Sequence, residues 1–163
     1  MTRFSASTDD EAIVAADRMA IWAVLTDPVL LPKLTPLLRS IDADGDLWTW
    51  HMMRISALGV GITPSFTERM TFTEGRRIEY AHEPPEGVTE RTSAQGCYEL
   101  SDAEDDTRLK IKLTLNVDLP LPRAASPAVT RVMTRMMGRT GDKFSANLYE
   151  HLGVDQPAER VSA

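Results

Sequence analysis

The most regular hydrophobic pattern in the chain runs from Thr107 to Leu119, where apolar and polar residues alternate without a break. One side of this run carries Leu109, Ile111, Leu113, Leu115, Val117 and Leu119. The other side carries Arg108, Lys110, Lys112, Thr114, Asn116 and Asp118. A period of two residues is typical of an antiparallel strand with one face on a core and the other in water. The segment 107–119 is therefore predicted to be a half-buried strand.

The same period recurs in shorter runs elsewhere in the chain. A first strand is predicted over Arg3–Ala15, with a bulge or a break where the acidic run 9–11 interrupts the apolar positions. Further strands, separated by turn-forming residues, are predicted in the segments 38–43, 48–55, 62–72, 78–82 and 89–100. Asp44-Gly45 is a strong hairpin signal between the first two of these. Residues 58–61 are interpreted as a connection or bulge.

Three helices are predicted from their start signals. Asp17 is a good N-cap for a short helix over Arg18–Leu25, and Asp27-Pro28 predicts the start of a second short helix. Ser126-Pro127 predicts the start of a long helix that ends near Gly153. The apolar positions of the long helix recur every three or four residues, as one buried face requires: Val129, Met133, Met136, Thr140, Phe144 and Leu148.

The order of these elements predicts an α+β domain. Short turns between consecutive strands indicate antiparallel pairing, and a sheet of six or seven strands must bury its apolar face against another layer. The long C-terminal helix is the largest apolar surface available for that purpose. A helix about 10–12 Å across does not fill the concavity of such a sheet. An apolar cavity is therefore predicted between the helix and the sheet.

Composition and charge narrow the class of protein. The 163 residues carry a net charge of −6, which argues against nucleic acid as a partner because phosphate binding needs a basic surface. The single cysteine, Cys97, has no second thiol for an intrachain disulfide. No segment approaches the roughly 20 apolar residues of a membrane span, and the first residues lack the apolar core of a signal peptide. A cytoplasmic location is expected.

Two segments resemble a known superfamily. Residues 15–28 (AADRMAIWAVLTDP) and 44–50 (DGDLWTW) are similar to the opening helices and the first hairpin of SRPBCC proteins. This superfamily includes START lipid-binding domains, Bet v 1-like proteins, polyketide cyclase/dehydrase-like proteins and the G-subunit family of carbon monoxide dehydrogenase. The resemblance covers roughly residues 3–152 and implies the helix-grip fold with an apolar cavity. Residues 1–153 would form this domain, and residues 154–163 a flexible C-terminal tail. Because function varies among the members, the resemblance does not fix a reaction.

The predicted cavity lining follows from the inward alternation of each strand and from the apolar face of the long helix. The chain has eight methionines, which suit either simple core filling or an adaptable apolar pocket. The predicted lining consists of Trp50, Met52, Phe66, Met70, Tyr80, Tyr98, Ile111, Leu113, Leu115, Met133, Met136, Thr140 and Phe144.

Glu68 is the most unusual candidate in this set, because strict alternation places its carboxylate on the same face as Phe66 and Met70. Burial there would raise the pKa of Glu68 unless a cation pairs with it, and Arg54 is the candidate partner. Such a group would orient a polar atom of a ligand or act as an acid or base. Alternatively, a bulge turns Glu68 outward, or the strand end at Glu68 is solvated. His82 either lines the mouth of the cavity or is a solvated or structurally bonded histidine.

Other recognised chemistry is not predicted. The three histidines lack a metal-binding spacing, and no HExxH motif is present, so no metal is expected. Gly59-Val60-Gly61 lacks the third glycine of a dinucleotide loop, and no cofactor is expected. Ser65 has neither a GxSxG context nor an evident triad.

A basic stripe is predicted along the long helix, where Arg131, Arg135, Arg139 and Lys143 recur every four residues. Like charges at this spacing are mildly destabilising in a helix. The stripe is either a solvated face or a contact surface. As a contact surface it would meet a second copy of the chain in a homodimer, an acidic partner or anionic lipid headgroups.

The leading functional hypothesis is the binding or transport of a small hydrophobic ligand, such as a lipid or a polyketide-like compound. No catalytic set is recognisable, so an enzyme is the less favoured class. The alternative is an enzyme similar to polyketide cyclases/aromatases, in which Glu68, Arg54, Tyr80 or His82 would steer proton transfers. A third hypothesis, which the resemblance to the carbon monoxide dehydrogenase family allows, is an assembly accessory that uses the basic stripe.

Overall fold

The computed structural model describes residues 1–156 and 161–162. The helical elements are α1 (Arg18–Leu25), α2 (Leu31–Leu34), a 3₁₀ turn η1 (Arg123–Ala125) and α3 (Ser126–Leu152). The strands are β1 (Thr2–Val14), β2 (Leu38–Asp44), β3 (Leu47–Met52), β4 (Ile55–Ala57), β5 (Val60–Ile62), β6 (Ser65–Thr73), β7 (Arg77–His82), β8 (Thr92–Ala103), β9 (Asp106–Leu119) and β10 (Val161–Ser162).

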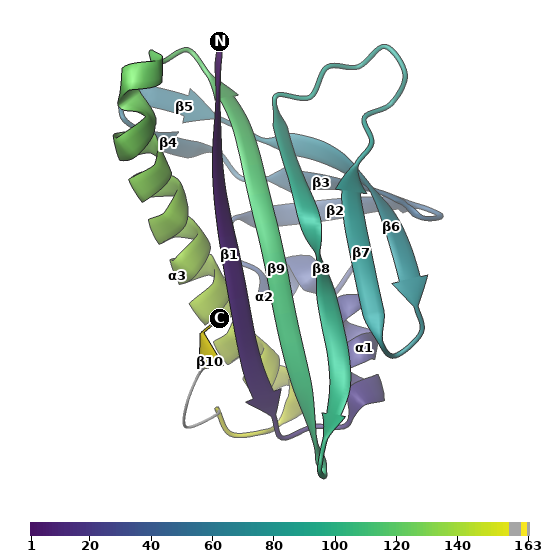
Figure 1. The fold of residues 1–163 in the computed structure, drawn as a ribbon. Coiled ribbons are helices and arrows are strands. Elements are labelled where there is room, and N and C mark those ends of the chain that lie inside the picture. The colour runs from purple at the N-terminus through teal and green to yellow at the C-terminus, as the bar shows by residue number, and fades with distance from the viewer. Residues whose placement is uncertain (157–160, 163) are drawn as a thin grey trace.

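Seven strands form one curved antiparallel sheet in the order β1-β9-β8-β7-β6-β3-β2, and the two-residue β10 pairs with the free edge of β1. Figure 1 shows the sheet curling so that β2 and β3 pass behind β8 and β9, with α3 running along the open side. The predicted α+β helix-grip architecture is confirmed. The predicted tail falls partly on residues 157–160 and 163, which lie outside the described residues.

The first strand is continuous where the sequence suggested a bulge or a break. β1 pairs with β9 in one unbroken register from Thr2 opposite Leu119 to Val14 opposite Thr107. The acidic run 9–11 is tolerated because two of its residues lie opposite lysines of β9, and Glu11 also forms an ion pair with Arg108. Opposite charges on adjacent strands stabilise the pairing.

The two short helices begin differently. The carboxylate of Asp17 accepts a 3.0 Å hydrogen bond from the amide of Met19, as predicted for the N-cap of α1. Asp27 accepts from the amides of Val29 and Leu30, but these residues form a turn, and α2 begins only at Leu31. The start predicted at Asp27-Pro28 was therefore early.

The long helix α3 spans 27 residues and ends at Gly153, whose φ of 70° is the left-handed C-cap that glycine favours. Its start differs by one residue from the prediction. Ala125 is the N-cap, and the hydroxyl of Ser126 donates to the carbonyl of Arg123 in the preceding turn. No helix among the described residues is long and apolar enough to cross a membrane.

The interior contains two separate packed clusters. The larger one joins α1, α2 and the C-terminal half of α3, and includes the fully buried Ile21, Ile78 and Leu148. The smaller one lies at the other end of α3 and is built on Phe4, Val117 and Val129. Because Val129 and Leu148 belong to different clusters, the middle of α3 spans the space between them.

Candidate ligand cavity

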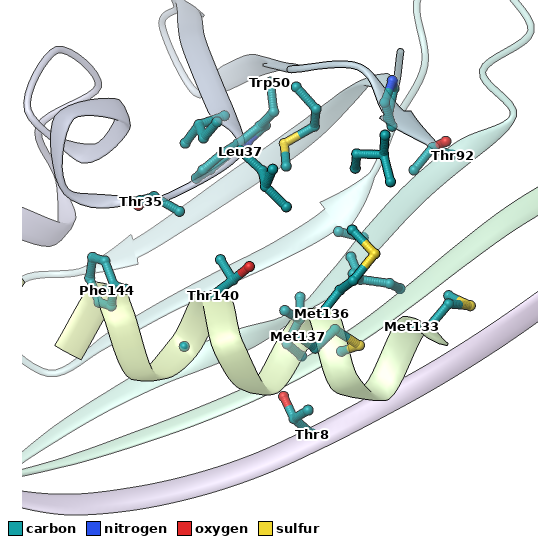
Figure 2. Close-up of a pocket in the computed structure, with 18 of the residues that line it drawn as sticks. Thr8, Thr35, Leu37, Trp50, Thr92, Met133, Met136, Met137, Thr140 and Phe144 are labelled. Atoms are coloured by element: carbon teal, nitrogen blue, oxygen red, sulfur yellow. The ribbon is translucent and has the colours of Figure 1, made fainter. Parts of the chain in front are cut away.

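A cavity of about 340 Å³ occupies this space between α3 and the sheet. Figure 2 shows Met136 and Thr140 of α3 facing Trp50 and Leu37 across it. The helix presents this row because residues three and four apart share one face. The opposite wall is formed by the sheet, where every second residue of a strand points inward, as Ile111 and Leu113 of β9 do. The lining is mostly apolar, with a minority of polar residues that includes Asp10, Glu68 and Asn116.

Most of the predicted lining residues do line this cavity. The set is Trp50, Met52, Phe66, Glu68, Tyr80, Tyr98, Ile111, Leu113, Leu115, Met133, Met136, Thr140 and Phe144. The structure does not bring Arg54, Met70 or His82 into the lining. Each of these three is displaced for its own physical reason.

Met70 faces the interior but not the cavity. Its side chain is 2% exposed and packs in the larger cluster, which also contains Ile21 and Leu25 of α1. Strand alternation correctly predicted that Met70 lies on the inner face of β6. It cannot show that α1 covers this part of the face and separates it from the cavity.

Arg54 is exposed, because β3 ends at Met52 and the strand alternation does not continue to residue 54. Its guanidinium lies over Gly61 of β5, where a Cβ atom would be 2.2 Å from an Arg54 nitrogen. The predicted Glu68–Arg54 ion pair is not among the ion pairs of the described residues.

His82 is bonded outside the cavity. Its Nε2 lies 2.9 Å from Oε1 of Glu90, and the same carboxylate accepts from the amide of Thr67 at 2.7 Å and from its hydroxyl at 2.8 Å. Glu90 thus attaches the 83–91 loop to β6 and supplies an acceptor for a strand amide. The sequence offered no signal for it, since a loop has no alternation from which to assign a face.

Glu68 lies in the cavity wall and is 2% exposed, so no bulge turns it outward. It forms none of the ion pairs of the described residues. Burial raises the pKa of Glu68 to about 8, while the nearby indole N–H of Trp50 acts in the opposite direction and more weakly. The carboxyl group is therefore mostly protonated and uncharged at neutral pH.

The two tyrosines beside Glu68 differ in how their hydroxyls are used. Their rings are in contact, with centroids 5.5 Å apart. Tyr80 donates a 3.0 Å hydrogen bond to the carbonyl of Lys112. Burial, followed by the nearby charge of Glu68, raises the pKa of Tyr98 above its usual range. Among the described residues the Tyr98 hydroxyl has no hydrogen-bond partner.

Leu37 and the β4–β5 hairpin were missed as parts of the lining. The hairpin contributes Ile55, Ala57, Leu58, Val60 and Ile62. It contains the segment 58–61 that was interpreted as a connection, and it stands beside the first turns of α3 in Figure 1. The two residues at its tip, Leu58 and Gly59, both have positive φ, as a type I′ turn requires. The strands are only three residues long, too short for a reliable alternation signal.

A chain of hydrogen bonds links Ser65, His51 and Asp42 on the outer face of the sheet. The hydroxyl of Ser65 lies 3.0 Å from Nδ1 of His51, and Nε2 lies 2.8 Å from Asp42. The two ring nitrogens have the opposite roles to those in serine hydrolases, and the Asp42 side chain is 79% exposed. None of these three residues lines the cavity between α3 and the sheet, so this cross-strand network is not a candidate active site.

Solved structures with the same arrangement of elements confirm the fold. A START superfamily protein from Mycobacterium smegmatis matches 90% of this chain and 97% of its own, with a TM-score of 0.63 and 17% identity. The ZhuI aromatase/cyclase from Streptomyces sp. R1128 matches 91% and 94%, with a TM-score of 0.64 and 13% identity. The chain has the helix-grip fold of START-like and Bet v 1-like proteins.

A third helix-grip structure is the di-domain aromatase/cyclase StfQ from the steffimycin biosynthetic pathway. It matches 92% of this chain and 51% of its own, with a TM-score of 0.62 and 12% identity. No protein-family model and no curated protein matches the sequence. Among the described residues, no group of three or more His, Cys, Asp or Glu side chains is placed to hold a metal ion.

Proposed function

We propose that this protein binds a small hydrophobic molecule, lipid-like or polyketide-like, in the cavity between α3 and the sheet. The observation that carries the proposal is the apolar cavity of about 340 Å³ between two packed clusters. Ligand pockets are commonly about 300–1,000 Å³ and mostly apolar, with a few polar groups that orient the ligand. The similar structures named START protein and aromatase/cyclase support the same class of ligand.

The volume limits the size of the ligand. An apolar protein cavity of about 150 Å³ holds one benzene molecule, so this cavity suits a compound of roughly two fused rings or a short acyl chain. Removing such a compound from water contributes about 25 cal/mol for each Å² of apolar surface buried. A long diacyl lipid does not fit without a change in shape.

The experiment is native mass spectrometry of the protein purified from its own host, followed by extraction and identification of any retained molecule. We expect one small apolar compound per chain, displaced by two-ring probes such as naphthalene derivatives. If the protein is recovered empty and binds no apolar probe of this size, the proposal is wrong.

A second candidate function is an enzyme that acts on a ligand held in the same cavity. The observation that favours it is the uncharged carboxyl group of Glu68 in the wall, because a buried acid of raised pKa is suited to proton transfer. The test is turnover of a compound identified in the first experiment. Activity that survives Glu68→Gln unchanged would remove Glu68 from this role.

A further inference from the structure

One region of the cavity wall has polar groups with no internal partner. The indole Nε1 of Trp50 is buried without a hydrogen bond of standard geometry among the described residues, and it approaches the carboxyl group of Glu68, whose charged form it stabilises only weakly. The phenol of Tyr98 also lines this part of the cavity, and the carboxyl group of Glu68 lies near both side chains. A buried donor without an acceptor is costly, so such groups in native proteins call for an explanation.

These three groups share one chemical property, because each can donate a hydrogen bond. An indole N–H is only a donor, a phenol donates readily, and a protonated carboxylic acid has one O–H to give. The neighbouring Tyr80 is already engaged by Lys112, so it does not compete for them. The region therefore presents three donor groups to the cavity, and the indole N–H of Trp50 can act there only as a donor.

The charged groups around this region do not supply a counterion to Glu68. On β7 its cross-strand neighbour His82 is bonded to Glu90. On β1 the lining includes Asp10 and Glu11, and Glu11 is paired with Arg108. The facing side of α3 contributes Met133, Met136, Thr140, Phe144 and Ser145, none of which carries a charge.

We propose that Glu68, Trp50 and Tyr98 bind the oxygen of an uncharged carbonyl group, as in a ketone, aldehyde or ester, on an otherwise apolar ligand. This inference rests on the proposed function and adds the chemical class of the ligand. A carbonyl oxygen has two lone pairs, enough for two of these three donors at one time, and it brings no charge into the apolar space. A carboxylate would place a negative charge beside Glu68, and an ammonium group would require Glu68 to ionise where water does not reach it.

The test compares four naphthalenes of nearly equal size: 2-acetylnaphthalene, 2-isopropylnaphthalene, 2-naphthoate and 2-naphthylmethylammonium. Binding is measured by calorimetry at pH 6.5 for the protein, for Glu68→Gln and for Glu68→Leu. We expect the ketone to bind the protein about tenfold or more tightly than the hydrocarbon. Glu68→Gln keeps an N–H donor and retains this preference, whereas Glu68→Leu loses most of it and still binds the hydrocarbon.

Two further measurements make the test specific. The carbonyl stretch of the bound ketone should shift to lower frequency in the protein and less in Glu68→Leu. Ketone affinity should fall as the pH rises above about 8, where Glu68 loses its proton, but not in Glu68→Gln, a comparison that does not depend on whether Glu68→Leu folds.

The outcomes separate the two proposals. Equal binding of ketone and hydrocarbon, or tighter binding of the ammonium compound, overturns the carbonyl site and leaves the hydrophobic cavity intact. Failure of all four compounds to bind overturns both proposals.

Discussion

The hydroxyl of Tyr80 reaches the backbone carbonyl of Lys112, two strands away, at 3.0 Å. Gly96 lies between them on β8, opposite Tyr80 in the register. A Cβ atom at residue 96 would lie 2.0 Å from the Lys112 oxygen and 2.9 Å from the Tyr80 oxygen. The absence of a side chain at this position is therefore what allows a tyrosine hydroxyl to be satisfied inside the sheet.

Gly96→Ala should destabilise the protein by about 2–4 kcal/mol, because overpacking and the lost hydrogen bond both act against the folded state. The measurement is urea unfolding followed by circular dichroism. Gly138→Ala is the matched control, since no atom lies within 4 Å of its added methyl group. In the interior of α3 that change should stabilise by about 0.5–1 kcal/mol. Similar effects at both positions would contradict the close approach at Gly96.

Met136→Trp should abolish the binding of two-ring probes and leave the melting temperature almost unchanged, because the larger side chain extends into the cavity that Met136 lines. Fluorescence titration with 2-acetylnaphthalene is the measurement. Thr134→Trp, on the exposed side of the same helix, is the control and should bind normally. Binding that survives Met136→Trp would place the ligand elsewhere.

Stability should fall with rising pH through the titration of Glu68. Its carboxyl has a usual pKa of 4.5 and a folded-state pKa of about 8. Below pH 4.5 the folded and the unfolded state both hold the proton of Glu68, and the full contribution of this group to stability is present. Between these values only the folded state holds the proton, so stability is lost progressively as the pH rises, on the order of 5 kcal/mol in total, and it levels off above about 8.

Urea unfolding at pH 5, 7 and 9 measures this dependence. Glu68→Gln has no proton to lose, so its stability should change less over this range and should exceed that of the parent at pH 9. Parallel pH profiles for the two proteins would show that Glu68 is not buried as an acid.

Glu90→Ala should destabilise the protein by about 2 kcal/mol, because the buried amide of Thr67 loses its acceptor. Glu86→Ala, an exposed glutamate of the same loop, should change stability by less than about 0.5 kcal/mol. Thermal unfolding compares the two variants. Amide exchange at Thr67 gives a local readout, which should become faster only in Glu90→Ala.

Much of the fold was predictable because it depends on patterns that are local in sequence. The alternation in 107–119 defined β9, and the same rule placed Phe66 and Glu68 on the inner face of β6. The row from Met133 to Phe144 followed from helical spacing. In each case one periodic element determines which face its side chains occupy, whatever the neighbouring elements do.

The remaining features depend on contacts between distant segments. Arg54 was placed wrongly because β3 ends two residues earlier, and only its packing over Gly61 shows this. Leu37 enters the cavity through a left-handed backbone conformation with a φ of 68°, which is uncommon for leucine. Glu90 acts through a loop that folds back on β6. None of these three residues lies in a regular strand or helix, so hydrophobic periodicity gives no information about the direction of its side chain.

The separation of the interior into two clusters has a consequence for detecting a ligand of unknown identity. Residues 136–141 of α3 lie between the clusters and border the cavity. Any occupant adds contacts to this stretch, whereas the helix ends are already packed. Hydrogen–deuterium exchange slowed at these central amides, and unchanged near 152, would therefore reveal occupancy in a crude extract before the compound had been purified.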